Sequence, residues 1–191
     1  DGYNIVMVGC LCTNFTISAD AGSNGGLYTW SATISSGQKP ITNNEQTESG
    51  TVYSAAPISL TTCTGATTVN SVASAVLSSF SVSIDSPAVY SGFSATGYAA
   101  FARAAELAVT ASAQIKYDSA TRPILNNFNT QTAHDAADAF TMTQATATDC
   151  SIAMGAGVLT NVALSEGDIM MLDVEMKAVN VGSDIITFNL A

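Results

Sequence analysis

The chain has 191 residues, of which 47% are hydrophobic and only 10% are charged, whereas ordinary soluble domains carry roughly 25% charged residues. Acidic residues outnumber basic ones by 15 to 5, giving a formal net charge of −10. This balance argues against a nucleic-acid-binding protein, which needs a basic surface. Such a sparsely charged surface is expected where other copies cover it, although a weakly charged secreted β-protein fits the composition as well.

The first third of the chain predicts a β-hairpin. Residues 3–8 indicate a strand, and residues 14–18 and 28–35 alternate between polar and apolar side chains, the period of a half-buried strand. Residues 20–26 between them have the composition of a turn. We therefore expect 14–18 and 28–35 to pair. After them we expect a polar loop over 37–50, a short strand at 57–62 and a small-polar stretch at 61–70.

The central stretch, residues 77–117, reads as strand, long loop, strand. Phe80, Val82 and Ile84 fall on one face of the first strand. Val109, Ala111, Ala113, Ile115 and Tyr117 share one face of the second, and the intervening positions in both strands are mostly Ser, Thr or other polar residues. Between them, residues 86–98 are rich in Gly, Ser and Pro and predict a loop. Residues 94–107 have some helical spacing, but we interpret them as loop entering the second strand.

The last third predicts the only helix and the remaining strands. Asp118 and Ser119 can cap a helix over 119–129, with Pro123 in its first turns, and a loop is expected over 129–137. In residues 169–178, Met170, Leu172, Val174 and Met176 face one way. The strands expected here are 138–146, 149–154, 158–164, 169–178 and 185–190, the last two forming a C-terminal hairpin. About nine or ten strands and one short helix indicate an all-β sandwich or barrel.

The residues that usually carry chemistry are few and scattered. We interpret the single histidine, His134, as a solvated loop residue. No nucleophile, phosphate-loop or dinucleotide motif is present, so we predict no enzyme activity, no cofactor and no metal. Asp173 and Glu175 lie two apart on one strand face, where Lys177 extends the same row. We expect Arg103 and Glu106 to lie near a neighbouring copy.

Four cysteines, Cys10, Cys12, Cys63 and Cys150, lack the spacing of a zinc site. Cys10 and Cys12 would share one strand face at roughly 6.5 Å, near the outer limit for a disulfide. We predict reduced, buried thiols, while the even count leaves disulfides open. The sequence has no transmembrane-length apolar run and no signal-peptide pattern. Because residue 1 is Asp1 rather than Met, whether residues precede it stays open.

The order of these elements resembles the tail tube proteins, or major tail proteins, of long-tailed bacteriophages. The resemblance is carried by residues 79–85, 109–118 and 124–128, and more loosely by the 14–34 hairpin and the strand 169–178. It implies one tail-tube domain over residues 1–191, all-β with one short α-helix and sandwich- or barrel-like. Its subunits would form hexameric rings with a closed β-barrel around a lumen, and the rings would stack into the tail tube of the virion.

The resemblance also implies partners and residue roles. The partners are other copies, a tape-measure protein, a tail-terminator protein and DNA that passes an acidic lumen without specific binding, with synthesis in the host cytoplasm and no membrane. A loop at 86–98, or at 37–50, would reach the next ring. The residues expected in this loop are Ser86, Pro87, Tyr90, Phe93 and Tyr98, and those expected in the lumen are Asp173, Glu175 and Asp85.

Other classes stay open at this point. One is a subunit of an extracellular cellular filament or surface protein. Another is a secreted β-sandwich that binds ligands such as carbohydrate, or an enzyme on such a scaffold. Within the viral class, a capsid decoration protein or a sheath component has a similar sequence character.

Overall fold

A computed structural model describes residues 4–7, 9–37, 41–43, 58–60, 67–73, 76–93, 99–130, 140–143, 150–179 and 185–190. The chain forms two compact units. The first contains Asp1–Phe15, Ser31–Ala56 and Ile84–Leu107, and the second contains Thr16–Trp30, Pro57–Ser83 and Ala108–Ala191. The described residues form fifteen strands, a 3-10 turn and one short α-helix, which confirms the all-β prediction.

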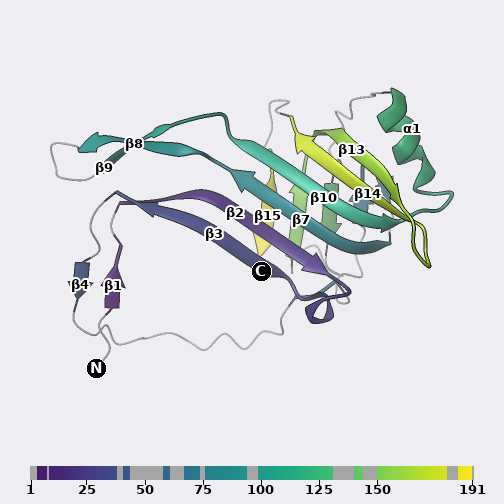
Figure 1. The fold of residues 1–191 in the computed structure, drawn as a ribbon, viewed down its shortest axis with the longest axis horizontal. Helices are drawn as coiled ribbons and strands as arrows, with labels where there is room; N and C mark the ends of the chain where they lie inside the picture. Colours follow the sequence, from purple (N-terminus) through teal and green to yellow (C-terminus); the bar gives the residue numbers. More distant parts are fainter. Residues whose placement is uncertain are drawn as a thin grey trace. The chain divides into compact units, whose positions relative to one another are not determined.

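A six-stranded sheet is the largest element of the fold (Figure 1). Its order is β13-β14-β10-β7-β2-β3. The six strands are β2 (Cys10–Asp20), β3 (Thr29–Ser36), β7 (Leu77–Asp85), β10 (Ala108–Lys116), β13 (Gly157–Ser165) and β14 (Met171–Ala178). The predicted pairing of residues 14–18 with 28–35 is confirmed as β2 beside β3. The turn between them contains η1 (Asn24–Gly26), where Gly25 and Gly26 have φ of 65° and 73°.

One face of this sheet builds the core of the second unit. Phe80 and Val82 of β7 are buried, and Val109, Ala111, Ala113 and Ile115 of β10 are buried in the same alternation. Leu172, Val174 and Met176 of β14 complete the row. These are the faces that the period of two predicted, because every second side chain of a strand points to the same side.

A second sheet covers this core face. Its order is β15-β12-β11-β5-β6, and Figure 1 shows it behind the first sheet. Its strands are β5 (Thr67–Val69), β6 (Val72–Ala73), β11 (Phe140–Thr143), β12 (Cys150–Met154) and β15 (Thr187–Leu190). The rings of Phe80 and Phe140, one from each sheet, lie 6.1 Å apart, so the two sheets pack as a sandwich.

The prediction of a C-terminal hairpin was wrong. The last strand, β15, pairs with β12 of the second sheet, with Ile152 opposite Phe188. The strand before it, β14, pairs with β10 and β13 of the first sheet. The chain therefore changes sheets between β14 and β15, because β14 already has partners on both sides.

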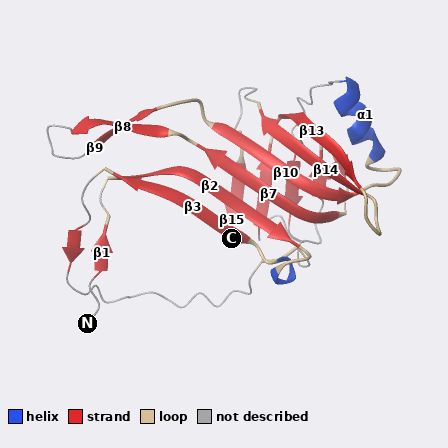
Figure 2. Ribbon diagram, in the orientation of Figure 1, coloured by secondary structure: helices blue, strands red, loops and turns tan. Residues whose placement is uncertain are grey.

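The helix α1 (Arg122–Thr130) follows β10, close to its predicted position (Figure 2). Asp118 caps it: its Oδ1 accepts hydrogen bonds from the backbone N–H of Ala120 at 2.9 Å and of Thr121 at 3.2 Å. The hydroxyl of buried Thr121 donates to the carbonyl oxygen of Lys116 at 2.9 Å. Ile124 is the fully buried residue of the helix. The Asp118 cap and the burial of Ile124 therefore fix the start of α1.

The first unit has two strand pairs of its own. The pair β1 (Asn4–Val6) and β4 (Ile41–Asn43) shows that the predicted loop 37–50 contains a strand. The pair β8 (Ala88–Phe93) and β9 (Ala99–Arg103) is antiparallel. In its described part, the predicted loop 86–98 therefore contains strand β8 of a β-hairpin. Residues 99–103, predicted as loop entering the next strand, form the separate strand β9.

Two shorter predictions also need correction. The strand expected at 57–62 is a single β-bridge between Leu27 and Ser59 in its described part. Cys10 and Cys12 are free thiols, as predicted, but both are exposed rather than buried. They lie on β2, and alternation alone does not say which face of a strand meets the core. Cys63 lies outside the described residues, as does the side chain of Cys150.

Candidate functional site

The face of the six-stranded sheet opposite the core is polar. We call the outward side chains of β2, β7, β10 and β14 in the second unit the polar face. The pairing of β10 with β14 places Gln114 opposite Asp173, Ser112 opposite Glu175 and Thr110 opposite Lys177. Serines and threonines fill the neighbouring positions on β7 and β2: Ser79, Ser81, Ser83, Thr16 and Ser18.

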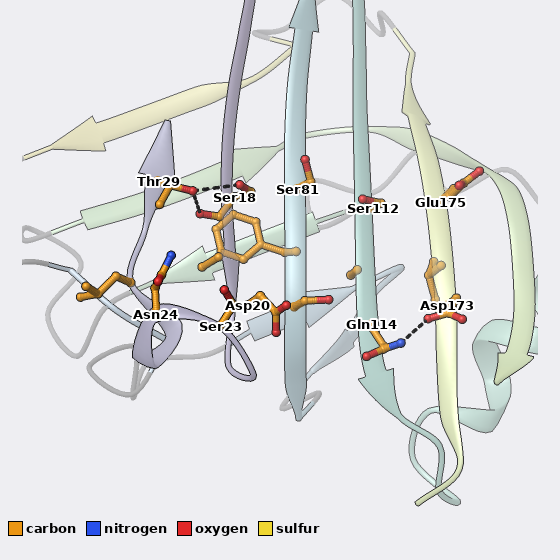
Figure 3. A pocket seen from close by; sticks show the side chains of 16 residues that line it. Ser18, Asp20, Ser23, Asn24, Thr29, Ser81, Ser112, Gln114, Asp173 and Glu175 are labelled. Carbon is orange, nitrogen blue, oxygen red and sulfur yellow. Dashed lines mark hydrogen bonds between the residues drawn. The ribbon is translucent and has the colours of Figure 1, made fainter. Parts of the chain in front are cut away.

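Hydrogen bonds between side chains tie these strands together across the face. The amide Nε2 of Gln114 donates to Oδ1 of Asp173 at 2.8 Å, as Figure 3 shows. Thr16 and Ser83 share a hydrogen bond of 3.1 Å between their hydroxyls. Ser18 and Thr29 share another of 3.2 Å. Side-chain hydrogen bonds thus join β10 to β14, β2 to β7 and β2 to β3 on the polar face.

A groove of about 400 Å³ lies on the polar face. Its polar lining comes from β2, the turn after it, β7, β10 and β14, including Asp20, Ser81, Gln114, Asp173 and Glu175 (Figure 3). A second hollow of about 280 Å³ is also lined by Ser81, Ser112 and Glu175. Short hydroxyl side chains leave these hollows open, since they fill less space than longer residues.

The charges on the polar face are few. Three carboxylates lie on it, from Asp20, Asp173 and Glu175, together with the ammonium groups of Lys116 and Lys177. Its formal net charge is therefore −1 per chain, three negative against two positive. The predicted pair Asp173 and Glu175 lies on this face. Sequence reasoning missed Gln114, which lies opposite Asp173, and Asp20, which lines the same groove from β2, three strands away from β14. Only the sheet order places these residues on one face.

The predicted residue Asp85 follows Ser83 at the next outward position of β7, but it lies outside the polar face as defined here because it belongs to the first unit. It is exposed, and it ends β7. The predicted residues Ser86 and Pro87 precede β8 there. The N–H of Ser86 donates to the carbonyl oxygen of Thr13 at 2.9 Å, and the carbonyl oxygen of Pro87 accepts from the N–H of Ala104 at 2.9 Å.

The hairpin of β8 and β9, named here the hairpin arm, holds most of the other predicted residues. The ring of Tyr90 packs edge-on against Phe101, with centroids 6.4 Å apart. Phe93 ends β8, and Arg103 ends β9 opposite Ala88. Glu106 is exposed after β9. Tyr98 and His134 lie outside the described residues.

The outer edge of the six-stranded sheet exposes a large apolar side chain. Trp30 on the edge strand β3 is 71% exposed. On the opposite edge, β13 pairs only with β14 in the described sheet. Within the described residues, β3 and β13 each have a strand partner on one side only, and α1 lies against β13. Strands at the edge of a sheet can pair with another chain.

No group of three or more His, Cys, Asp or Glu side chains within the described ranges could hold a metal ion. In the same ranges, no helix has the length and apolar character that crossing a membrane requires. The surface features are a polar wall, two sheet edges and a two-stranded arm, which are features suited to assembly.

Two comparisons bear on this site. A family model described as "Phage tail tube protein" matches residues 1–178. No curated protein matches the chain.

Proposed function

The chain belongs to the phage tail tube protein family: it is a structural component of the virion tail that self-assembles into a tube, and we propose that six copies close each ring of that tube. The rings stack around a lumen through which DNA passes, and a tape-measure protein and a tail-terminator protein meet the tube inside and at its end. The chain is made in the host cytoplasm. No step of this function is catalytic.

The observation that carries ring closure is the exposed Trp30 on an edge strand. Edge strands with unpaired N–H and C=O groups pair readily with another strand, and tryptophan is enriched where interfaces form. Pairing of β3 with β13 of the next copy would continue the six-stranded sheet from chain to chain. A ring built this way closes into a barrel and leaves no free edge.

The same pairing would line the lumen with the polar face. The core face already packs on the second sheet, so the polar face is the side of each wall that remains to face a channel. Its Ser and Thr hydroxyls are neutral, and its net charge is −1 per chain, with Asp173 and Glu175 at its centre and Asp85 as a further candidate. Such a wall repels phosphate weakly and offers it no cationic patch.

The hairpin arm is the proposed contact between rings. An isolated two-stranded hairpin is marginally stable in water, so this one gains from a partner. Arg103 and Glu106 at its base are the proposed charged contacts between copies. The arm replaces the predicted loop in this role, since residues 88–93 and 99–103 are strands.

Substitution of Trp30 tests ring closure. A tryptophan side chain offers roughly 150–250 Å², and covering the 71% that is exposed is worth on the order of 3 kcal/mol per interface at about 25 cal/mol per Å². Trp30→Ser is expected to raise the concentration needed for rings more than tenfold in sedimentation velocity and negative-stain microscopy. Ser31→Ala, on the same strand, is the control. Equal assembly of Trp30→Ser and wild type would refute the role of this edge.

A further inference from the structure

The turn that joins β2 to β3 contains the only Asn-Gly dipeptide of the sequence, Asn24-Gly25. Both residues lie in η1 and are exposed. Both have a positive φ, 49° for Asn24 and 65° for Gly25, a conformation that asparagine and glycine adopt more readily than other residues. No atom of a more distant part of the chain lies within 4 Å of the position where a Cβ of Gly25 would be. The backbone around Gly25 is therefore open on its outer side.

The hydrogen bonds of this turn leave two groups without a partner. The N–H of Gly26 donates to the carbonyl oxygen of Ser23 at 2.9 Å. The N–H of Leu27 donates to the backbone carbonyl oxygen of Asn24 at 3.3 Å. Within the part of the chain that the structure describes, neither the N–H of Gly25 nor the side-chain amide of Asn24 forms a hydrogen bond. Figure 3 shows the Asn24 side chain among those that line the groove of the polar face.

These two groups are the reactants of asparagine deamidation. The backbone nitrogen of Gly25, after losing its proton, attacks the side-chain carbon Cγ of Asn24. A new C–N bond closes a five-membered succinimide ring, the bond from Cγ to Nδ2 breaks, and ammonia leaves. Water then opens the ring at one of its two carbonyl carbons and gives aspartate or isoaspartate. The step is intramolecular, which raises the effective concentration of the nucleophile, and its only co-reactant is water.

We propose that Asn24 is a site of spontaneous deamidation in the folded chain, and that the product adds a carboxylate to the groove of the polar face. Asp20, Asp173 and Glu175 already line this groove, so the product gives it a fourth carboxylate. The modification adds one negative charge to a chain whose formal net charge is −10. On the proposed assignment of the polar face to the lumen, the added charge makes the channel wall more repellent to phosphate. The modification itself does not depend on that assignment.

Asn70 offers a matched comparison within the same chain. It lies in the turn between β5 and β6 and also has a positive φ, of 47°. In contrast to Asn24, it is only 2% exposed and is followed by Ser71 rather than by glycine. The Cβ of Ser71 hinders attack by the nitrogen of that residue, and burial limits both the rotation of the Asn70 amide and the access of water. The two asparagines therefore share a backbone conformation and differ in the features that deamidation requires.

The first test is incubation of the purified full chain under native, mildly alkaline conditions, followed by peptide mapping with mass spectrometry. Asn24 is expected to deamidate at least tenfold faster than Asn70, and at a rate within tenfold of its rate in the urea-unfolded chain. The rate at Asn24 is expected to rise with pH, because the nitrogen of Gly25 attacks after losing its proton. Equal rates at Asn24 and Asn70, or deamidation of Asn24 only after unfolding, would overturn the proposal.

The second test uses two variants at position 24 and anion-exchange chromatography of the unassembled chain. Asn24→Asp carries the carboxylate from the start and is expected to elute with the deamidated fraction of the incubated wild-type chain. Asn24→Gln keeps a neutral amide, but its extra methylene requires a six-membered ring, so this variant is expected to keep its elution position. A shift of Asn24→Gln as large as that of wild type would overturn the assignment to Asn24. Because the chain is unassembled, either result leaves the proposed ring and its test unaffected.

Discussion

The polar face gives a prediction in which the sign of a charge decides the outcome. Asp173→Asn with Glu175→Gln, made in an Asp85→Asn background so that this further lumen candidate adds no charge, removes two of the three carboxylates of the polar face. Its net charge changes from −1 to +1 per chain, because Lys116 and Lys177 stay. In the proposed ring of six copies, the net charge of the polar face changes from −6 to +6. The Asn side chain keeps a carbonyl oxygen that can accept from Gln114, so the wall itself should stay ordered.

DNA retention should follow this sign. A wall with net positive charge binds phosphate through counterion release, and for about six to ten contacts such binding falls by about 10³ to 10⁵ between 50 and 200 mM salt. Tubes of the double variant are expected to retain short duplex DNA on pelleting at about 50 mM salt and to release it at about 200 mM. Wild-type tubes are expected to retain none at either salt concentration.

The opposite change is the control for this experiment. Lys116→Gln with Lys177→Gln also alters two charges on the polar face but makes its net charge −3 per chain. These tubes should remain free of DNA. Double-variant tubes of Asp173→Asn and Glu175→Gln that release DNA as readily as wild type would refute the assignment of the polar face to the lumen, provided that microscopy shows them intact.

Three further predictions concern the fold. Thr121→Val should lower the free energy of unfolding by about 1–3 kcal/mol in urea titration, because the buried hydroxyl links the start of α1 to β10. Thr121→Ser keeps the hydroxyl and should lower the free energy of unfolding less. Equal decreases for the two variants would contradict the role of this hydrogen bond. Phe80→Ala should cost about 3–5 kcal/mol, since its ring packs between the sheets, and a cost under about 1 kcal/mol would place it outside the core. Cys10 and Cys12 should react with a thiol reagent in the native, unassembled chain; reaction only after denaturation would contradict their exposure.

The core strands could be predicted from the sequence because one face of each is buried. Phe80 and Val82, or Val109 and Ala111, alternate with small polar residues, and the structure buries these apolar positions. The same alternation placed Asp173 and Glu175 on the outer face. The other residues of that face come from β10, β7 and β2, which are distant in sequence. Gln114 and Asp20 could therefore be assigned to the same face only once the order of the strands was known.

The hairpin arm could not be predicted in the same way. Its strands belong to a two-stranded ribbon that has no buried face of its own, so β8 and β9 carry no apolar alternation, and Gly92 and Ser91 in β8 have loop composition. The pairing of β15 was missed for a related reason. Sequence proximity favours a hairpin with β14, but the partner is set by which strands are still unpaired, and that is a property of the whole sandwich.

Along β14, residues that pack in the core alternate with residues of the polar face. Val174 is buried, whereas Glu175 next to it is exposed on the polar face. Because successive side chains of a strand point to opposite sides, a substitution of Val174 changes the packing of the core, whereas a substitution of Glu175 changes the polar face. On the proposed assignment of the polar face to the lumen, substitutions at its Ser, Thr, Asp and Glu positions are expected to change the lumen without loss of core packing. Because the polar face consists mostly of short neutral hydroxyl side chains, its few carboxylates and lysines set the sign of its charge.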